Sequence, residues 1–299
     1  MKWRGRRKSS NVEDRRGQSA GGFGGGRGIS PMLLIPLFRF LFSKVGLVVL
    51  AVLALLFIIT GTSPLTLLQQ FVGGEPQYAQ STEYQPGPVE QELAEQTKVV
   101  LADTEDVWNR MIDGYREPTL VLFSGQVNSA CGTASSASGP FYCPGDEKLY
   151  IDLSFFSEME RKLGAGGDFA QAYVVGHEVG HHIQKLTGTL EQVNAMRGQL
   201  SEVEFNKLMV RVELQADFYA GVWAHHTQKT KGFMETGDLE EALNAASAIG
   251  DDRLQKQSTG RVVPDSFTHG TSAQRVRWFR KGFETGDVSQ GDTFNAAEL

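Results

Sequence analysis

Cysteine is scarce in this sequence of 299 residues, which contains only Cys131 and Cys143. Cysteine-type zinc sites usually draw on two pairs of closely spaced cysteines, so the lack of a second pair argues against zinc ligation by these two. The stretch between them is rich in Gly and Ser. It predicts a loop closed by a disulfide in an oxidising compartment, with two unrelated thiols as the alternative.

The sequence also lacks a small-x-small cleavage motif after its long apolar run, residues 45–63. That run has no charged residue and is about as long as the shortest transmembrane helices. Residues 1–44 hold ten Lys or Arg against two acidic residues, although the whole chain has a net charge of −6. A basic flank is typical of the cytoplasmic side of a span. We therefore expect an uncleaved anchor that contacts membrane lipid, and no nucleic-acid partner for the basic segment.

Composition divides the chain into four parts. Residues 1–44 are basic and rich in Gly, and we expect a disordered cytoplasmic segment. The predicted transmembrane anchor, residues 45–63, is followed by a linker over 64–88. Residues 89–299 have the mixed composition of one domain, which this topology places outside the cytoplasm. No internal repeat interrupts it.

Hydrophobic periodicity indicates the elements of that domain. It predicts helices over 89–112, 168–188, 204–225, 238–248 and 272–283, three of them capped by Asp168, Asp238 and Ser272. Short runs rich in β-branched and aromatic residues predict strands over 119–123 and 148–153. A helix-rich domain with a small sheet belongs to the α+β class.

The motif with the most chemical content is His177-Glu-Val-Gly-His181, within a predicted helix. Residues four apart share a helix face, so His177 and His181 direct two imidazoles toward one metal ion. Glu178 is offset by one position and flanks that ion. It is placed to act as general base, and then as general acid, on a zinc-activated water.

A zinc site of this kind needs a third ligand. The extended pattern with Gly and a third His farther along the same helix is excluded, because Gln184 and Thr187 occupy those positions. Glu213 and Asp217 lie four apart in the otherwise apolar helix 204–225 and share a face. We predict Glu213 as the ligand and Asp217 as the partner of a ligating imidazole. An ordinary surface pair on an amphipathic helix is the alternative.

Together these residues resemble the glutamate-type zincins, in which His-Glu-x-x-His is followed by Glu-x-x-Ala-Asp on a second helix. Further stretches over nearly the whole chain resemble the bacterial family of putative neutral zinc metallopeptidases: Cys131-Gly, Gly139-Pro-Phe-Tyr-Cys143-Pro, Tyr150-Ile-Asp-Leu and Asp265-Ser-Phe-Thr-His269-Gly-Thr. The resemblance implies a zincin-like fold, with Tyr150 to Leu153 as the edge strand that holds an extended substrate. With the predicted anchor, it implies a single-pass protein of the bacterial inner membrane with a periplasmic or extracellular domain.

Thr268-His269-Gly270, followed by Arg275, resembles an element found downstream of the ligands in membrane zincins. The histidine of that element can polarise the scissile carbonyl, so the resemblance implies His269 as a second catalytic residue. A loop histidine without a catalytic role is the alternative. Tyr219 is another candidate for stabilising the oxyanion.

These patterns predict a membrane-anchored zinc-dependent endopeptidase, with Zn²⁺ bound by His177, His181 and Glu213, acting on a peptide or protein substrate. A non-enzymatic membrane-anchored interaction domain with structural zinc is the alternative. It is disfavoured because structural sites have four protein ligands and the sequence offers three. A metal-dependent hydrolase of another substrate class is a third possibility. The sequence predicts neither the cleavage preference nor the oligomeric state.

Overall fold

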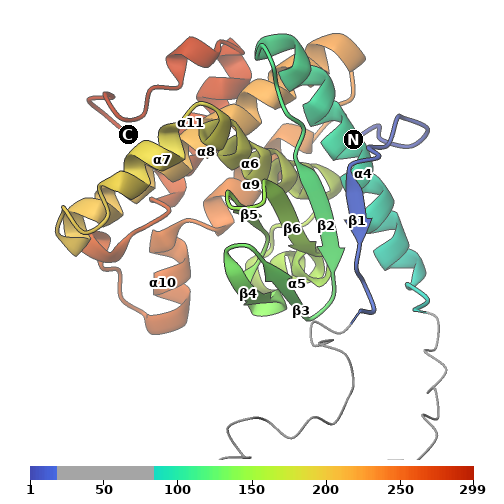
Figure 1. Cartoon of the computed structure of the whole chain (residues 1–299), viewed down its shortest axis with the longest axis horizontal. Helices are drawn as coiled ribbons and strands as arrows, with labels where there is room; N and C mark the ends of the chain where they lie inside the picture. Colours follow the sequence, from blue (N-terminus) through green and yellow to red (C-terminus); the bar gives the residue numbers. More distant parts are fainter. Residues whose placement is uncertain (19–83) are drawn as a thin grey trace, which may run out of the picture. The chain divides into compact units, whose positions relative to one another are not determined.

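The computed structural model of the chain describes residues 1–18 and 84–299, and their fold is mostly helical (Figure 1). The α-helices in this part of the chain are α4 (Pro88–Met111), α5 (Ser154–Leu163), α6 (Asp168–Leu186), α7 (Thr189–Ala195), α8 (Glu202–Lys231), α9 (Asp238–Ala248), α10 (Asp251–Thr259) and α11 (Ser272–Thr285). Short 3-10 turns are η1 (Ser136–Ser138), η2 (Pro264–Ser266) and η3 (Val288–Gln290).

The strands are β1 (Val12–Asp14), β2 (Thr119–Phe123), β3 (Gln126–Ser129), β4 (Gly132–Ser135), β5 (Phe141–Cys143) and β6 (Lys148–Asp152). Four of them form a sheet in the order β1-β2-β6-β5, and β3 and β4 form an antiparallel pair. β1, β2 and β6 are parallel, whereas β5 is antiparallel to β6. β6 therefore lies inside the sheet. The expectation that Tyr150 to Leu153 forms the substrate-binding edge is wrong, because β5 takes the edge position.

The two faces of the sheet pack against different parts of the molecule, as the alternation of side chains along a strand requires. Leu120 and Leu122 of β2 belong to the main hydrophobic core with the helices. Val121 and Phe123 face the other way and pack in a smaller cluster with Val127 of β3.

The disulfide predicted between Cys131 and Cys143 is confirmed, with their Cα atoms 5.8 Å apart. Cys143 is also part of the smaller hydrophobic cluster. The bridge therefore ties the loop that follows β3 to edge strand β5.

α6 occupies the centre of the helical part and packs against α4, α8 and α9, while α8 also packs along α11. The approach of α6 to α8 is close at Gly180, where an added Cβ would lie 2.8 Å from the carbonyl oxygen of Ala216. A glycine is required at this position because the two backbones nearly touch. The contact brings together the two helices that carry the predicted metal ligands.

The predicted helices and the strand 119–123 are confirmed, with small shifts at their ends except in α8, which continues to Lys231 instead of ending at residue 225. The predicted caps are each displaced by one residue, since Gly167, Gly237 and Thr271 hold the N-cap positions. Asp168 and Asp238 are the first residues of α6 and α9 instead, where a negative charge interacts favourably with the positive end of the helix dipole. Both also contact the α-amino group of Met1, at 2.6 and 3.4 Å.

Residues 1–18 are folded against the domain, which corrects the expectation of disorder for this part of residues 1–44. Met1 and Trp3 are buried in the main core, and β1 adds a strand to β2. Figure 1 shows β1 beside both β2 and α4. The basic residues of the segment pair with acidic residues of α4: Arg6 with Asp103, Arg7 with Glu105 and Asp106, and Lys8 with Glu95. Residues 19–44 lie outside the described part.

The predicted transmembrane helix and the inner-membrane location are wrong, and the physical reason lies in β1. Its pairing with β2 places residues on both sides of the predicted span, residues 45–63, on the same side of any membrane. A single crossing between them would separate the two strands. Within the residues that the structure describes, no helix is long and apolar enough to cross a membrane, and 45–63 lies outside them.

The α+β class with a preceding anchor is corrected to a mostly helical fold with small sheets. Most of the predicted linker, 64–88, also lies outside the described residues.

Removal of the Trp3 side chain tests the structural role of the N-terminal segment. Trp3 is 8% exposed and packs in the main core. We expect Trp3→Ala to lower the free energy of unfolding by about 3–5 kcal/mol, as large aromatic truncations in cores do. Denaturant unfolding of the full chain measures the loss.

Lys8→Ala is the matched control, because Lys8 is half-exposed in its ion pair with Glu95 and such pairs contribute about 0–1 kcal/mol. Equal, small losses for both variants would contradict the integration of residues 1–18 into the core.

Candidate metal centre and active site

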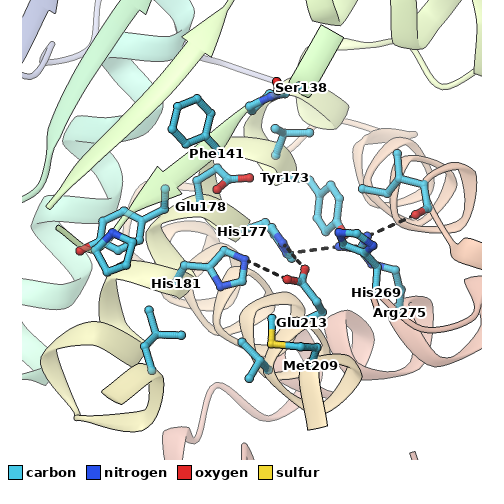
Figure 2. Close-up of a pocket in the computed structure, with 18 of the residues that line it drawn as sticks. Ser138, Phe141, Tyr173, His177, Glu178, His181, Met209, Glu213, His269 and Arg275 are labelled. Carbon is cyan, nitrogen blue, oxygen red and sulfur yellow. Dashed lines mark hydrogen bonds and ion pairs between the residues drawn. The ribbon is translucent and has the colours of Figure 1, made fainter. Parts of the chain in front are cut away.

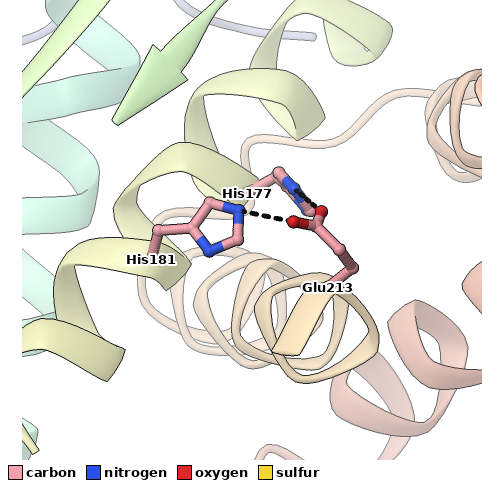
Figure 3. Close-up of side chains that lie close together, drawn as sticks. All are labelled: His177, His181 and Glu213. Atoms are coloured by element: carbon pink, nitrogen blue, oxygen red, sulfur yellow. Dashed lines mark hydrogen bonds and ion pairs between the residues drawn. The ribbon is translucent and has the colours of Figure 1, made fainter. Parts of the chain in front are cut away.

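The three predicted metal ligands converge between α6 and α8. His177 and His181 lie one turn apart on α6, and Glu213 faces both from α8 (Figure 3). The Nε2 atom of His177 is 3.2 Å from Glu213 Oε2, and that of His181 is 3.6 Å from Oε1. Two ligands of a tetrahedral zinc ion with bonds of about 2.0–2.1 Å lie ~3.3 Å apart. The donor set and its spacing therefore fit zinc.

Each ligating imidazole is held through its other ring nitrogen. His177 Nδ1 lies 2.8 Å from Asp217 Oδ1, and His181 Nδ1 lies 2.8 Å from Gln184 Oε1. The amide orientation of Gln184 is fixed because its Nε2 donates to the carbonyl oxygen of Val212. An amide oxygen only accepts, so the Nδ1 atom of His181 carries a proton, and Nε2 is the ring nitrogen that faces Glu213.

Asp217 is the centre of a buried polar cluster behind His177. Arg275 of α11 forms two hydrogen bonds to its carboxylate, Nε to Oδ2 at 2.8 Å and Nη2 to Oδ1 at 3.0 Å. Tyr173 donates its hydroxyl to Oδ1 at 2.5 Å. Burial raises the pKa of Asp217, but the charges of Arg275 and His177 outweigh it and hold the pKa at about 2. Asp217 is therefore an anion at neutral pH, and its orientation is fixed by three neighbours.

The field of the two carboxylates favours positive charge at the ligand positions. Burial lowers the pKa of His177, yet the charge of Asp217 and the hydrogen bonds to Asp217 and Glu213 raise it to about 10. Burial likewise opposes ionisation of Glu213, but its imidazole neighbours hold the pKa of that carboxyl well below 4.5. The pocket thus stabilises a cation between these side chains, which is the electrostatic requirement for a metal site.

A cavity of about 490 Å³ opens over the three ligands, and Glu178 and His269 both line it. Figure 2 shows the Glu178 carboxylate between the imidazoles and Phe141 of β5. In the part of the chain that the structure describes, this carboxylate has no hydrogen-bond partner, so its oxygens are available to a substrate or to water.

His269 belongs to a tightly organised loop before α11. One carboxylate oxygen of Asp251 accepts the backbone N–H groups of Thr268, His269 and Gly270 at 2.8, 2.6 and 3.0 Å. The other oxygen lies 3.3 Å from His269 Nδ1. The hydrogen bond with Asp251 raises the pKa of His269 above 6.5 despite partial burial. Glu213 adds to this rise and Arg275 opposes it.

The structure brings together all the predicted site residues except Tyr219. That side chain is buried at 6% exposure and packs edge-on against Trp108, 5.8 Å between ring centroids, and it does not line the cavity. Its proposed oxyanion role is wrong because it faces the core. Sequence reasoning missed the supporting roles of Tyr173, Gln184 and Asp251. Tyr173 and Gln184 could have been found, since they lie four before His177 and three after His181 on one helix, whereas Asp251 gave no signal.

A helical domain in which His-Glu-x-x-His on α6 faces a glutamate on α8 has the site architecture of a metallohydrolase. A sequence profile of the family described as putative neutral zinc metallopeptidases matches residues 1–294. The chain belongs to this family, and the resemblance seen in the sequence is confirmed. The family name implies a zinc ion, in agreement with the His and Glu donor set.

Similar proteins carry names without a function. The uncharacterized protein YpfJ of Escherichia coli (strain K12) is 50% identical over 298 residues, which cover 98% of this chain and 99% of YpfJ. The uncharacterized protein Rv2575 of Mycobacterium tuberculosis (strain H37Rv) is 47% identical over 203 residues, or 64% of this chain and 68% of that protein. No solved structure gives a significant match.

Removal of the Arg275 charge tests the buried cluster. Arg275 is 2% exposed, and Arg275→Met leaves Asp217 as a buried anion without its cation. We expect the free energy of unfolding to fall by about 3–5 kcal/mol. Thermal and denaturant unfolding measure this loss.

Arg277→Met is the matched control on the same helix, since the ion pair of Arg277 with Glu298 is largely exposed and is expected to contribute about 0–1 kcal/mol. A similar loss in the two variants would show that the ion pair of Arg275 with Asp217 contributes no more to the free energy of unfolding than an exposed pair does.

Proposed function

We propose that this protein is a zinc-dependent endopeptidase in which His177, His181 and Glu213 bind the ion. The observation that carries the proposal is the convergence of both Nε2 atoms and the Glu213 carboxylate at the spacing of zinc ligands. The side of the site that faces the cavity is lined by two further polar groups, Glu178 and His269. Three protein ligands and an open fourth side are typical of catalytic zinc, whereas structural zinc is enclosed by four ligands.

A peptide is the substrate class that the shape of the cavity favours. Edge strand β5 borders it through Phe141 and Tyr142, and the preceding loop contributes Ser138 and Gly139. An extended peptide can add to a sheet edge through its main chain, with its side chains directed alternately to the two faces. An edge strand beside the cavity favours a peptidase over a hydrolase that acts on compact small molecules.

In the proposed mechanism the residues of the chain move the protons. A zinc ion bound here would supply Lewis-acid chemistry, which polarises a carbonyl group and makes water more acidic. Glu178 takes the proton of the attacking water and delivers it to the nitrogen of the leaving amine. His269 donates a hydrogen bond to the carbonyl oxygen as negative charge develops there. Asp217 and Gln184 keep the two imidazoles in their ligating orientation.

Two isosteric substitutions separate the roles of the two glutamates. Glu178→Gln keeps the shape of the side chain but removes the base, so we expect about one zinc per chain with turnover lowered about 10²- to 10⁴-fold. Glu213→Gln weakens a ligand, so zinc content and turnover should fall together. Metal analysis of the purified full chain and hydrolysis of a peptide library measure both quantities.

Wild-type protein that is folded and metal-replete yet binds no zinc would refute the proposed site. If Glu178→Gln hydrolysed peptides as fast as the wild type while zinc stayed bound, the catalytic role of Glu178 would be wrong. A zinc-loaded wild-type protein without any hydrolytic activity would favour the structural-zinc alternative.

The role of His269 has its own signature in the pH dependence. Its donor is present while the imidazole is protonated, and it is lost as pH rises through its pKa, which Asp251 raises above 6.5. We expect His269→Phe to lower kcat about 10²-fold, the cost of one oxyanion donor, with zinc content unchanged. In the wild type, kcat should fall as pH rises through the pKa of His269. This alkaline fall should be absent from the pH profile of His269→Phe. An unchanged profile in His269→Phe would contradict the assignment.

A further inference from the structure

The charges that line the cavity all belong to the candidate active site. They are His177, Glu178, His181, Glu213, His269 and Arg275. Among the described residues, no other Asp, Glu, Lys, Arg or His lines this space. The remaining lining is dominated by apolar and aromatic side chains, so the parts of the cleft away from the metal ligands offer no partner for a charged substrate side chain.

One end of the cleft is apolar beyond His181. α7 follows the C-terminal end of α6, and its residues Leu190, Val193 and the uncharged polar Asn194 line the cavity. Met209 completes this end from α8, one turn before Glu213. In Figure 2, Met209 lies beside Glu213 and away from His269. A large apolar side chain can be buried here.

The opposite end is apolar as well. Ile249 and Leu254 line the cavity there. The carbonyl oxygen of Ile249 lies 3.4 Å from Nη1 of Arg275, which places this end on the His177 side of the site. Figure 2 shows His181 and Arg275 on opposite sides of Glu213. The candidate metal site therefore lies between two apolar ends.

Exposed apolar side chains lie on or directly after α7 and α10 in the chain. Met196 and Leu200 follow α7 directly, Leu254 lies on α10 itself, and Val262 and Val263 follow α10. In the described part of the chain, the other exposed large apolar residues are Tyr84 and Val89. Exposed apolar residues that gather on particular segments mark binding surfaces. Of these residues Leu254 lines the cavity, and the other four follow in the chain the two helices, α7 and α10, that contribute to its ends.

We propose that the cleft binds extended polypeptide with large apolar residues on both sides of the scissile bond. Because such residues are buried in folded proteins, the substrate presents them when it is unfolded. This inference rests on the proposed peptidase function, which it deepens by naming the substrate class. Leu190 determines the preference on one side of the scissile bond, and Leu254 determines it on the other.

Peptide binding by the full-length Glu178→Gln protein tests the inference without turnover. The probes are two fluorescently labelled peptides with the same flanks, one with Phe-Leu at its centre and one with Lys-Glu. Burial of two large apolar side chains should make the Phe-Leu peptide bind at least about tenfold more tightly. Fluorescence anisotropy measures both affinities. Equal affinities, tighter binding of the Lys-Glu peptide or no binding of either would overturn the inference.

Charge substitutions test the two ends separately in the same Glu178→Gln background. Leu190→Lys and Leu254→Lys should each weaken binding of the Phe-Leu peptide about tenfold and favour peptides in which one central residue is Glu. The two variants should select Glu on opposite sides of the central bond. Val89→Lys is the matched control, because Val89 is exposed on α4 and does not line this cavity. The assignment would be contradicted if Val89→Lys weakened binding as much as the other two variants do. It would also be contradicted if Leu190→Lys and Leu254→Lys selected Glu on the same side of the central bond.

Turnover by the wild-type protein separates this inference from the proposed function. Cleavage of a peptide library between large apolar residues supports both, and cleavage mainly next to charged residues overturns the substrate class alone. Selective binding of the Phe-Leu peptide by Glu178→Gln, with no cleavage by the zinc-loaded wild type, supports the apolar cleft and refutes the peptidase.

Discussion

The buried ion pair between Asp217 and Arg275 is the interaction on which the site depends. It joins α8 to α11 and reaches α6 through Tyr173 and His177. A buried carboxylate without a partner is costly, so the packing of these three helices is destabilised unless Arg275 takes this position. The same ion pair therefore stabilises the packing of the helical core and fixes the orientation of a predicted metal ligand, His177.

The same logic applies to each histidine of the cavity. An imidazole has two nitrogens, and it can present one to a metal ion or a substrate only if the other is held. Asp217 holds His177, Gln184 holds His181 and Asp251 holds His269. Two of these partners accept through a carboxylate and one through an amide. The amide holds His181 without adding a further carboxylate to the site.

The N-terminal residues show how a local interpretation can mislead. A basic segment followed by an apolar run has the composition of a membrane anchor with a cytoplasmic flank. In the structure the basic side chains instead neutralise the acidic face of α4, and β1 completes the sheet. Composition describes which charges a segment carries, but it cannot describe which partner neutralises them.

The sequence by itself predicted the two helices that carry the candidate ligands and the shared face of His177 and His181, because these depend on the short repeat of an α-helix. It also determined the family and the disulfide. Only the tertiary structure decided that β5 is the sheet edge, that Tyr219 faces the core, and that Asp251 supports His269. It likewise decided that residues 1–18 belong to the domain. These facts depend on contacts between residues far apart in the chain, and no local pattern of side chains encodes which distant surfaces will meet.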